Sequence, residues 1–554
     1  MVLVGSPRFR DSTLRDVASA HGDAAAWQAA VDRLGRNAAM SVDGEFAVGL
    51  ADARGRVFLA VDRFASHGLC WRMIDGKVHW SERADELAAL APRADVDPQA
   101  VYDYLYFHVI PSPRTIYRGV HRVPAGHTLW FDQGQCSLFP HWRPEFTEPR
   151  AGAISASGLD ARFRDLLSQA VGRSLDGSKP ACFLSGGTDS STVAGMATRL
   201  AGRVSTYSIG FAADGYDEMA YARIAARHFG TDHHEYYVTP EDLIGSIPDV
   251  ARHYDQPFGN SSVLPAFCCA RMAAQDGVTR LLAGDGGDEF FGGNTRYAKQ
   301  QVFGFYDAVP GLLRRGVLEP LLVGSPVGAL PLLKKGRSYI EQARVPMPAR
   351  MHTYNLLERV GVERVLTPDF IAAVTMPDTA RQQGEVWGES EGASLINRML
   401  AYDWRYTLAE CDLPKVRGST ALAGVAAAFP MLDADLVDFS LRLPSDMKVR
   451  RLQLRWFFKQ ALRGFLPDEI ITKKKQGFGL PFGVWAASHP GLNRFAADAL
   501  ATLAERGIVR PDFIRPLIED MLPSHPGYYG ELVWILVMLE HWFRGEGVGA
   551  NGLT

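Results

Sequence analysis

The segment 184–191, with the sequence LSGGTDSS, has the composition of a loop that binds phosphate. It follows a short apolar segment and opens a segment typical of a helix. Gly186 and Gly187 let the backbone approach an anion, and Ser185 and Ser190 add hydroxyl donors. The segment is not the GxxxxGK[ST] loop of kinases and GTPases, because it has no lysine. Taken alone, it is also compatible with an ordinary glycine-rich turn between a strand and a helix.

Asp189 would be repelled by phosphate unless a cation lies between them. Mg²⁺ is such a cation, because it binds one or two carboxylates together with phosphate oxygens. A second acidic segment, GDGGDEFFGG at 284–293, also follows a segment typical of a strand. Ligands of a doubly wound sheet collect at the carboxyl ends of its strands. We therefore predict that Asp189 and Asp288 hold Mg²⁺ on a pyrophosphate group, although the second segment is also compatible with a flexible acidic loop.

Both motifs lie where segments typical of strands and helices alternate. The strand segments are at 181–184, 204–211, 233–238 and 278–284, and the helical ones at 190–201, 219–230 and 263–277. This alternation predicts an α/β fold with a parallel, doubly wound sheet. From about residue 295 to the end the pattern is mostly helical.

The first part of the chain has a different pattern, and we assign it to a domain at 1–150. Short apolar segments separated by glycine and aspartate turns favour antiparallel sheets. These segments lie at 45–52, 56–64 and 76–82. Asp97 before Pro98 marks the start of a helix. A stretch rich in Pro, Gly and Ser at 145–158 precedes the second domain, which we place at 155–545.

The composition is that of an ordinary globular protein. The chain has 554 residues, 47% of them apolar and 22% charged, with a net charge of −3, so nucleic acid and an anionic membrane are not expected partners. No run of about 18 apolar residues predicts a membrane span, and the N-terminal residues lack the apolar core of a secretory signal. The six cysteines have neither a disulfide framework nor zinc-ligand spacing. We therefore expect a cytoplasmic protein.

The order of the motifs resembles the synthetase domain of asparagine synthetase-like enzymes. The matching segments are SGGTDSS, YSIGF, HFGTDHHE, DQPFGNSS, GDGGDEFFGG, FPMLDADLVDFSLRLP and KKKQGFGLPF, spread over residues from about 155 to 545. The same order occurs in β-lactam synthetases and lasso-peptide cyclases. The resemblance implies an ATP-pyrophosphatase fold with ATP and Mg²⁺ as cofactors. It also implies the reaction: ATP adenylates a carboxylate, pyrophosphate leaves, and an amine attacks the acyl-adenylate to give an amide.

The resemblance also implies roles for single residues in binding ATP. The phosphate-loop residues would bind its pyrophosphate part, namely Leu184, Ser185, Gly186, Gly187, Asp189 and Ser190. Ile209 and Gly284 would lie at the adenosine pocket. Asp189 and Asp288 would bind Mg²⁺, in agreement with the argument from charge.

Three further residues would take part in the chemistry. Lys475 matches the family lysine of the KxxF pattern and would stabilise charge that develops on phosphate, although Lys473 and Lys474 adjoin it. Glu410 falls where relatives carry a carboxylate near the acceptor, and it would receive a proton from the attacking amine. Its alternative is an ordinary glutamate on a helix surface. Asp285 is a second candidate for contact with the acyl-adenylate.

Residues 42–135 resemble the glutaminase half of asparagine synthetases, which has the antiparallel fold of N-terminal nucleophile hydrolases. That half uses the thiol of an N-terminal cysteine, exposed when Met1 is removed. Here residue 2 is Val2, and the first cysteine is Cys70. Unless the true start of the protein differs, we expect a degenerate glutaminase-like domain without its opening strand and without glutamine hydrolysis.

Two departures from asparagine synthetases bear on the substrate. The segment 424–433 has alanines where those enzymes carry a glutamate and an arginine, so we expect a roomier, less polar pocket. The helical insert at 295–400 would present a basic surface to a larger substrate, or simply carry solvated charge. Its basic residues are Arg314, Arg315, Lys334, Lys335 and Arg337.

The favoured function is closure of a macrolactam within a precursor peptide, as in lasso-peptide cyclases. A side-chain carboxylate would be adenylated and attacked by the N-terminal amine of the same peptide, which needs no ammonia. A peptide-processing protease would then be a partner. The alternatives are an ammonia-dependent asparagine synthetase, a β-lactam synthetase-like ligase on a small acid, and a non-enzymatic relative that binds ATP.

Overall fold

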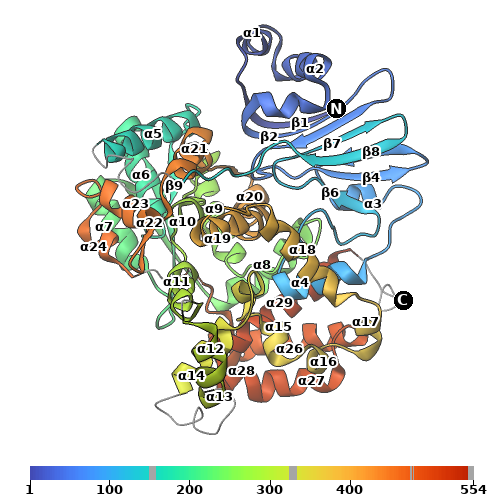
Figure 1. Ribbon diagram of the computed structural model, residues 1–554, viewed down its shortest axis with the longest axis vertical. Helices are drawn as coiled ribbons and strands as arrows, with labels where there is room; N and C mark the ends of the chain where they lie inside the picture. Colours follow the sequence, from blue (N-terminus) through green and yellow to red (C-terminus); the bar gives the residue numbers. More distant parts are fainter. Residues whose placement is uncertain (149–157, 308, 323–333, 475–476, 478, 547–554) are drawn as a thin grey trace.

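The computed structural model describes residues 1–148, 158–307, 309–322, 334–474, 477 and 479–546. The chain forms an antiparallel β domain, a parallel α/β domain and a helical C-terminal part (Figure 1). This is the predicted fold class. The predicted domain boundary between residues 150 and 155 lies outside the described residues.

The front domain is built on two antiparallel sheets. The larger has the order β1-β2-β3-β7-β8, and the smaller has the order β5-β4-β6. Alternate side chains of facing strands form a shared apolar core between the sheets, which includes Leu59, Val78 and Leu129. The strands are β1 (Val2–Phe9), β2 (Val42–Ala51), β3 (Val57–Val61), β4 (Cys70–Ile74), β5 (Lys77–Ser81), β6 (Val120–Arg122), β7 (His127–Asp132) and β8 (Gln135–Pro140).

Helices complete the front domain. α1 (Ser12–His21), α2 (Asp23–Leu34) and η1 (Gly35–Ser41) precede β2, and the fully buried Trp27 packs against Phe46 with ring centroids 5.0 Å apart. α3 (Ala84–Ala88) follows the hairpin formed by β4 and β5. α4 (Pro98–Phe107) begins as predicted, because the side chain of Asp97 accepts the backbone N–H of Gln99.

The expectation that the opening strand is missing is wrong. Residues Val2–Phe9 form β1, which pairs antiparallel with β2 over its whole length. Gly5 and Pro7 break the apolar alternation, so local pattern alone did not indicate a strand. An edge strand tolerates Pro7 because one of its sides needs no ladder hydrogen bond. Tertiary pairing with β2 thus overrides a weak local signal.

The second domain is built on a parallel sheet with the order β11-β10-β9-β12-β13. The four predicted strands are confirmed, as β9 (Ala181–Phe183), β10 (Ser205–Phe211), β11 (Asp232–Val238) and β12 (Arg280–Leu282). The fifth, β13 (Ala426–Ala428), was not predicted, because three alanines have little strand propensity. The chain runs outward from β9 in one direction and from β12 in the other. Their junction is the switch point at which doubly wound sheets bind ligands.

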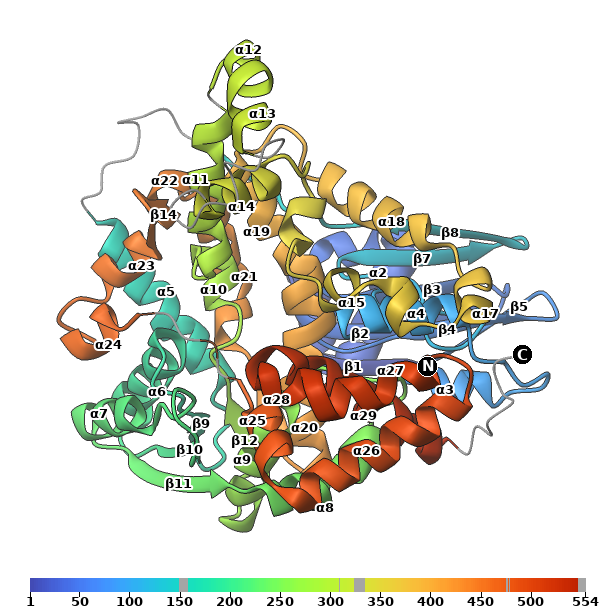
Figure 2. The same cartoon turned by 90° about the horizontal axis from the view of Figure 1, so that it is seen from below.

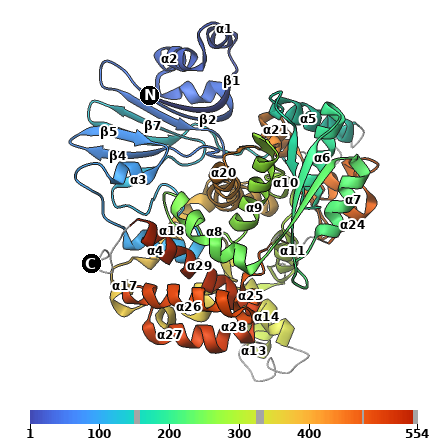
Figure 3. The same ribbon diagram turned by 180° about the vertical axis from the view of Figure 1, so that it is seen from behind.

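Helices cover both faces of this sheet (Figure 3), and β10 is buried at every residue, whereas the edge strand β11 is mostly half-buried. One layer contains α5 (Leu159–Ser174), α6 (Thr188–Ala201) and α7 (Met219–Phe229), and the other α8 (Pro240–His253), α9 (Val263–Gln275) and α20 (Leu413–Leu422). The three helices predicted between the strands are confirmed as α6, α7 and α9. Parallel strands joined by helices require this sandwich, because each helix must bury an apolar face on the sheet.

The insert between the acidic loop and α20 is helical, as predicted. The acidic loop itself contains α10 (Gly287–Phe291). The insert comprises α11 (Thr295–Asp307), α12 (Gly311–Leu313), η2 (Arg314–Leu318), α13 (Glu319–Leu322), α14 (Lys334–Ala343), η4 (Ala349–His352), α15 (Leu356–Val360), α16 (Val362–Val365), α17 (Pro368–Ala372), α18 (Met376–Gly388), α19 (Leu395–Asp403) and the π-helix η5 (Trp404–Asp412).

The C-terminal part is also mostly helical. Its elements are η6 (Pro430–Leu432), α21 (Ala434–Arg442), α22 (Ser445–Lys448), β14 (Val449–Arg450), β15 (Gln453–Leu454), α23 (Trp456–Ala461), α24 (Asp468–Thr472), α25 (Phe482–Ser488), α26 (Pro490–Glu505), α27 (Pro511–Pro516), η7 (Leu517–Met521), α28 (Leu522–Ser524) and α29 (Pro526–Gly545). Within the described part of the chain, no helix combines the length and the apolarity that a membrane crossing requires.

The last helix, α29, lies among α25, α26 and α28 and is buried along most of its length (Figure 2). Its Glu540 has no exposed surface, and its carboxylate oxygens accept from Arg506 at 2.6 Å and from Arg544 at 2.8 Å. Two guanidinium groups thus compensate one buried charge.

We expect Glu540→Ala to lower the free energy of unfolding by about 3–5 kcal/mol, because it leaves the buried Arg506 without this counter-ion. Glu519→Ala is the matched control. It removes an exposed ion pair with Arg515 and should cost at most about 1 kcal/mol. Urea denaturation followed by circular dichroism measures both variants. Equal midpoints for the two would contradict the assignment.

A buried lysine joins the front domain's last described residues to α22. Lys448 has no exposed surface, and its Nζ donates to Asn397 Oδ1 at 2.8 Å. Asn397 in turn donates to Glu148 at 2.7 Å. Burial lowers the pKa of Lys448 to about 7, although Glu148 opposes this shift. Between about pH 7 and the ordinary lysine pKa, the unfolded chain therefore binds more protons than the folded chain, and stability rises with pH.

Because of this linkage, we expect the stability of the Lys448→Met variant to depend less on pH than that of the wild type. At and below pH 7 the wild-type protein loses stability by holding a proton on a buried amine, whereas methionine does not. The urea midpoint of the wild type, relative to that of Lys448→Met, should rise between about pH 7 and pH 9. Parallel pH profiles of the two proteins would show that the amine does not titrate in this range.

Candidate active site

A cavity of 320 Å³ opens at the switch point between β9 and β12. The phosphate loop follows β9, and the acidic loop follows β12, so the two predicted motifs meet there. Eight of the predicted residues line the cavity: Leu184, Ser185, Asp189, Ser190, Ile209, Gly284, Asp285 and Asp288. Gly187 lines a neighbouring cavity. The convergence of the two motifs is thus confirmed, because parallel strands end at the same edge of a sheet.

The phosphate loop is shaped by its own serines. The Ser185 N–H donates to Ser190 Oγ at 3.2 Å, and the two hydroxyl oxygens lie 3.0 Å apart. α6 begins directly after Gly187, and no side chain caps its N-terminus. The first N–H groups of a helix have no partners within the helix, so they can bind an anion. This arrangement fits the phosphate role predicted for the loop.

The two predicted metal carboxylates converge on one point. A Cβ added to Gly287 would overlap the carboxylate of Asp189, and one added to Gly293 would overlap that of Asp288. Glycine is therefore required at both positions for this close approach. Two carboxylates without further protein ligands suit Mg²⁺, which completes its shell with water and phosphate oxygens. The described residues contain no group of three or more His, Cys, Asp and Glu that could hold a metal.

The guanidinium of Arg455, a residue that was not predicted from the sequence, bridges these carboxylates. It donates to Asp189 and Asp288 and also to the hydroxyl of Thr188. The side chain is 4% exposed. Burial disfavours its charge, but the two aspartates outweigh this effect and raise its pKa. The β14–β15 hairpin delivers Arg455, and a backbone hydrogen bond to Gly292 holds it on the acidic loop. No local signal could have identified it, because the contact spans 266 residues.

The cavity has an apolar part and an acidic part. Phe183, Tyr207, Ile209, Pro265, Ala266 and Cys269 line the apolar part, which is suited to a flat aromatic base. Asp285, Glu289 and Asp412 line the acidic part together with Lys415. Lys415 Nζ lies 2.9 Å from Asp412 and 3.3 Å from Asp285. Burial disfavours the charge of Lys415, but the two aspartates raise its pKa.

Burial also raises the pKa of Asp285, although Lys415 opposes the shift. Asp285 was predicted from the sequence, whereas Asp412 and Lys415 were not. These two are three residues apart on a helix, a spacing that places side chains on one face. The expectation of a roomier, less polar pocket from the segment 424–433 stays a prediction, because its alanines at 426–428 are not in contact with this cavity. Those alanines form β13.

Glu410 does not line the cavity, so the structure gives no support to its predicted role as proton acceptor. It is 5% exposed and accepts hydrogen bonds from the N–H of Ser112 at 3.1 Å, from the Ser112 hydroxyl and from Arg122. Ser112 and Arg122 belong to the front domain. Residues two apart on a helix do not share a face, so Glu410 and Asp412 point to different sides of η5.

A second cavity, of 590 Å³, adjoins the first across Ser185, Asp189 and Ser190. Its lining is rich in cationic side chains, namely Arg455, Lys459, Arg463, Lys473 and Lys474. Lys473 Nζ lies 2.6 Å from Glu218 and 3.4 Å from the carbonyl oxygen of Gly186 in the phosphate loop. The predicted catalytic Lys475 lies outside the described residues.

Comparisons with known proteins agree with this geometry. A family model described as Asparagine synthase matches residues 162–544, and one described as Glutamine amidotransferase domain matches residues 12–142. The chain belongs to the asparagine synthase family. Membership makes it an ATP-dependent carbon–nitrogen ligase.

Individual relatives are distant. The glutamine-hydrolyzing asparagine synthetase 1 of Bacillus subtilis is 23% identical over 463 residues, which are 83% of this chain and 71% of the relative. A putative asparagine synthetase of Mycobacterium tuberculosis is 27% identical over 71% of this chain and 59% of its own length. The carboxyethyl-arginine beta-lactam-synthase of Streptomyces clavuligerus is 31% identical over 53% of this chain and 56% of its own length. The chain thus spans little more than half of the last two.

We expect Asp189→Asn to lower ATP–pyrophosphate exchange by about 100-fold or more, because it removes one of the two carboxylates that would hold the metal. Asp232→Asn, a change of an exposed aspartate at the start of β11, is the matched control and should leave exchange unchanged. Calorimetry with Mn²⁺ and a non-hydrolysable ATP analogue gives an independent readout. Tight metal binding in Asp189→Asn would contradict the assignment.

Proposed function

We propose that this protein adenylates a carboxylate with ATP, releases pyrophosphate and couples the acyl group to an amine. The proposal is supported chiefly by the position of Asp189, which lies between a partly apolar cavity and a cation-lined cavity. Adenosine fits the first cavity, and the β- and γ-phosphates fit the second. Cleavage of the α–β phosphate bond would therefore take place at the phosphate loop, between the two cavities.

The groups around the loop suit this step. The N–H groups at the start of α6 would bind phosphate oxygens, and Lys473 and Lys459 would neutralise charge on the leaving pyrophosphate. Mg²⁺ held by Asp189 and Asp288 would supply further neutralisation. Arg455 would then exchange its bonds to the aspartates for bonds to phosphate. A guanidinium suits this exchange because it binds carboxylate and phosphate with the same paired donors.

The acidic part of the first cavity suits the second step. The attacking nitrogen forms a bond to the acyl carbon, the bond from that carbon to the AMP oxygen breaks, and AMP leaves as an anion. The nitrogen must also lose a proton, which Asp412 or Asp285 would accept. Lys415 lies between the two carboxylates and would hold them in place. Net negative charge in this part favours the approach of an amine as its ammonium ion. Such an ion must first give up one proton before its nitrogen can attack, so Asp412 and Asp285 would each accept one of the two protons released.

The substrate pair proposed is a side-chain carboxylate and the N-terminal amine of one precursor peptide, joined as a macrolactam of the kind made by lasso-peptide cyclases. Such a substrate brings its own amine, so no glutamine hydrolysis is required. The basic helical insert would contact the rest of the peptide, and a processing protease would supply the mature N-terminus. A second candidate is β-lactam formation on a small acid, which the Streptomyces clavuligerus relative favours by its name.

The test measures AMP and pyrophosphate release from Mg-ATP with three sets of substrates: candidate peptides that contain Asp or Glu, aspartate with ammonia, and a carboxyethyl amino acid. Release with a peptide only, with a product one water lighter than the peptide, supports the macrolactam. Formation of asparagine would replace it with an ammonia-dependent synthetase. No release with any carboxylate would contradict the ligase itself.

We expect Asp412→Asn to retain ATP–pyrophosphate exchange and to slow amide formation by about 100-fold, the contribution typical of a proton acceptor. Asparagine has nearly the same shape but cannot take the proton. Asp435→Asn, at an exposed aspartate of α21, is the control. Equal losses in exchange and in amide formation would show that Asp412 does not act in the second step alone.

A further inference from the structure

The front domain makes polar contacts with two segments that line the first cavity and with a third that packs beside the acidic loop. One such segment is 255–262, which ends at the cavity residue Ser262. Asp255 accepts from the N–H of Ala84 at 2.8 Å, and the Gly259 N–H donates to the carbonyl oxygen of His108 at 2.8 Å. Ala84 and His108 are front-domain residues, so the front domain fixes both halves of this segment.

The second segment is the continuous helix formed by η5 and α20. Glu410 near its middle is held by Ser112 and Arg122, and Arg417, seven residues further on, donates to Glu45 at 2.7 Å. All three partners lie in the front domain. The cavity residues Asp412 and Lys415 lie between these two attachment points. The contacts of Glu410 and Arg417, on the opposite side of the helix, therefore fix the direction in which Asp412 and Lys415 point.

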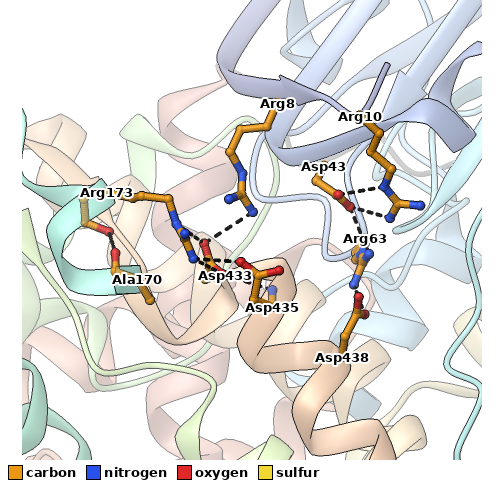
Figure 4. A network of polar contacts seen from close by, with 10 residues as sticks. Arg8, Arg10, Asp43, Arg63, Ala170, Arg173, Asp433, Asp435 and Asp438 are labelled. Atoms are coloured by element: carbon orange, nitrogen blue, oxygen red, sulfur yellow. Dashed lines mark hydrogen bonds and ion pairs between the residues drawn. The ribbon is translucent and has the colours of Figure 1, made fainter. Parts of the chain in front are cut away.

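The third segment is η6 with α21, which packs in the same apolar cluster as Phe290 of the acidic loop. Arg8 of β1 lies 3.3 Å from Asp433, and Arg63 lies 2.7 Å from Asp438 (Figure 4). Arg173 of α5 also binds Asp433, at 2.6 Å. These ion pairs are more exposed to solvent than the pair of Arg122 with Glu410. In that pair the side chain of Glu410 is 4% exposed and that of Arg122 is 17% exposed. Because salt and water screen exposed pairs, the buried contact is the stronger constraint.

We propose that the front domain serves as the anchor that directs Asp412 and Lys415 into the acceptor side of the cavity, with Glu410 as the positioning residue. This rests on the proposed function, since it assigns the acceptor step to these side chains. The front domain thus acts in amide formation whether or not it hydrolyses glutamine. The phosphate loop is held instead by β9 and the start of α6, so adenylation does not depend on this anchor.

The sharpest variant lies in the front domain and leaves every cavity residue in place. Arg122→Met removes the ion pair with Glu410 while keeping an apolar stem of similar length. ATP–pyrophosphate exchange and trapping of the acyl-adenylate with hydroxylamine report adenylation, and product formation reports the acceptor step. We expect adenylation within about twofold of the wild type and product formation at least about tenfold slower. Arg122→Lys should restore part of the loss.

Arg56→Met is the matched control, because it removes an arginine–carboxylate pair that lies wholly within the front domain. It should leave both half-reactions unchanged. Hydrogen exchange gives a second readout that needs no substrate. Arg122→Met should speed exchange in residues 404–417 and leave residues 184–201 unchanged.

Equal loss of both half-reactions, or faster exchange throughout the molecule, would overturn the proposal by showing a general structural role. Unchanged product formation together with unchanged exchange at 404–417 would overturn it as well. Absence of any wild-type turnover would count against the proposed function instead, while hydrogen exchange would still decide whether the front domain controls this helix.

Discussion

The structure depends on the repulsion between two aspartates that the sheet brings together. Asp189 and Asp288 follow neighbouring strands, and glycines at 287 and 293 let their carboxylates converge. Two neighbouring negative charges repel each other, and a cation between them relieves this repulsion. Arg455 supplies one, and it reaches the site from a hairpin in the C-terminal part. The acidic loop, the phosphate loop and the hairpin are therefore joined by one electrostatic constraint.

The same constraint explains why the two cavities differ in charge. Lys459, Arg463 and Lys473 lie on the side of Asp189 where phosphate would leave. Asp285 and Asp412 lie on the side where an amine would arrive. A pyrophosphate anion and an ammonium ion are thus attracted to opposite ends of one site. The charges of the two cavities alone would therefore place the leaving group and the attacking amine at different ends of the site, with no conformational change required.

The front domain adds a second level of organisation. Its buried contact with Glu410 connects it to the helix that carries Asp412 and Lys415. Polar contacts across this junction are numerous and partly buried, which favours a fixed arrangement of the two domains over independent motion. The opening strand β1, which the sequence pattern did not reveal, provides Arg8 for one of these contacts.

The sequence alone determined the features that depend on short segments. Strand and helix periodicity identified four of the five parallel strands, and glycine with serine and aspartate identified both loops of the cavity, because such signals need only neighbouring residues. Only the tertiary structure decided which distant side chains meet. Arg455, Lys415 and Asp412 acquire their roles through contacts that span more than a hundred residues or depend on which face a helix turns inward, and Glu410 loses its predicted place for the same reason. The alanine strand β13 and the edge strand β1 likewise form because a neighbouring strand supplies hydrogen bonds that local propensity does not encode.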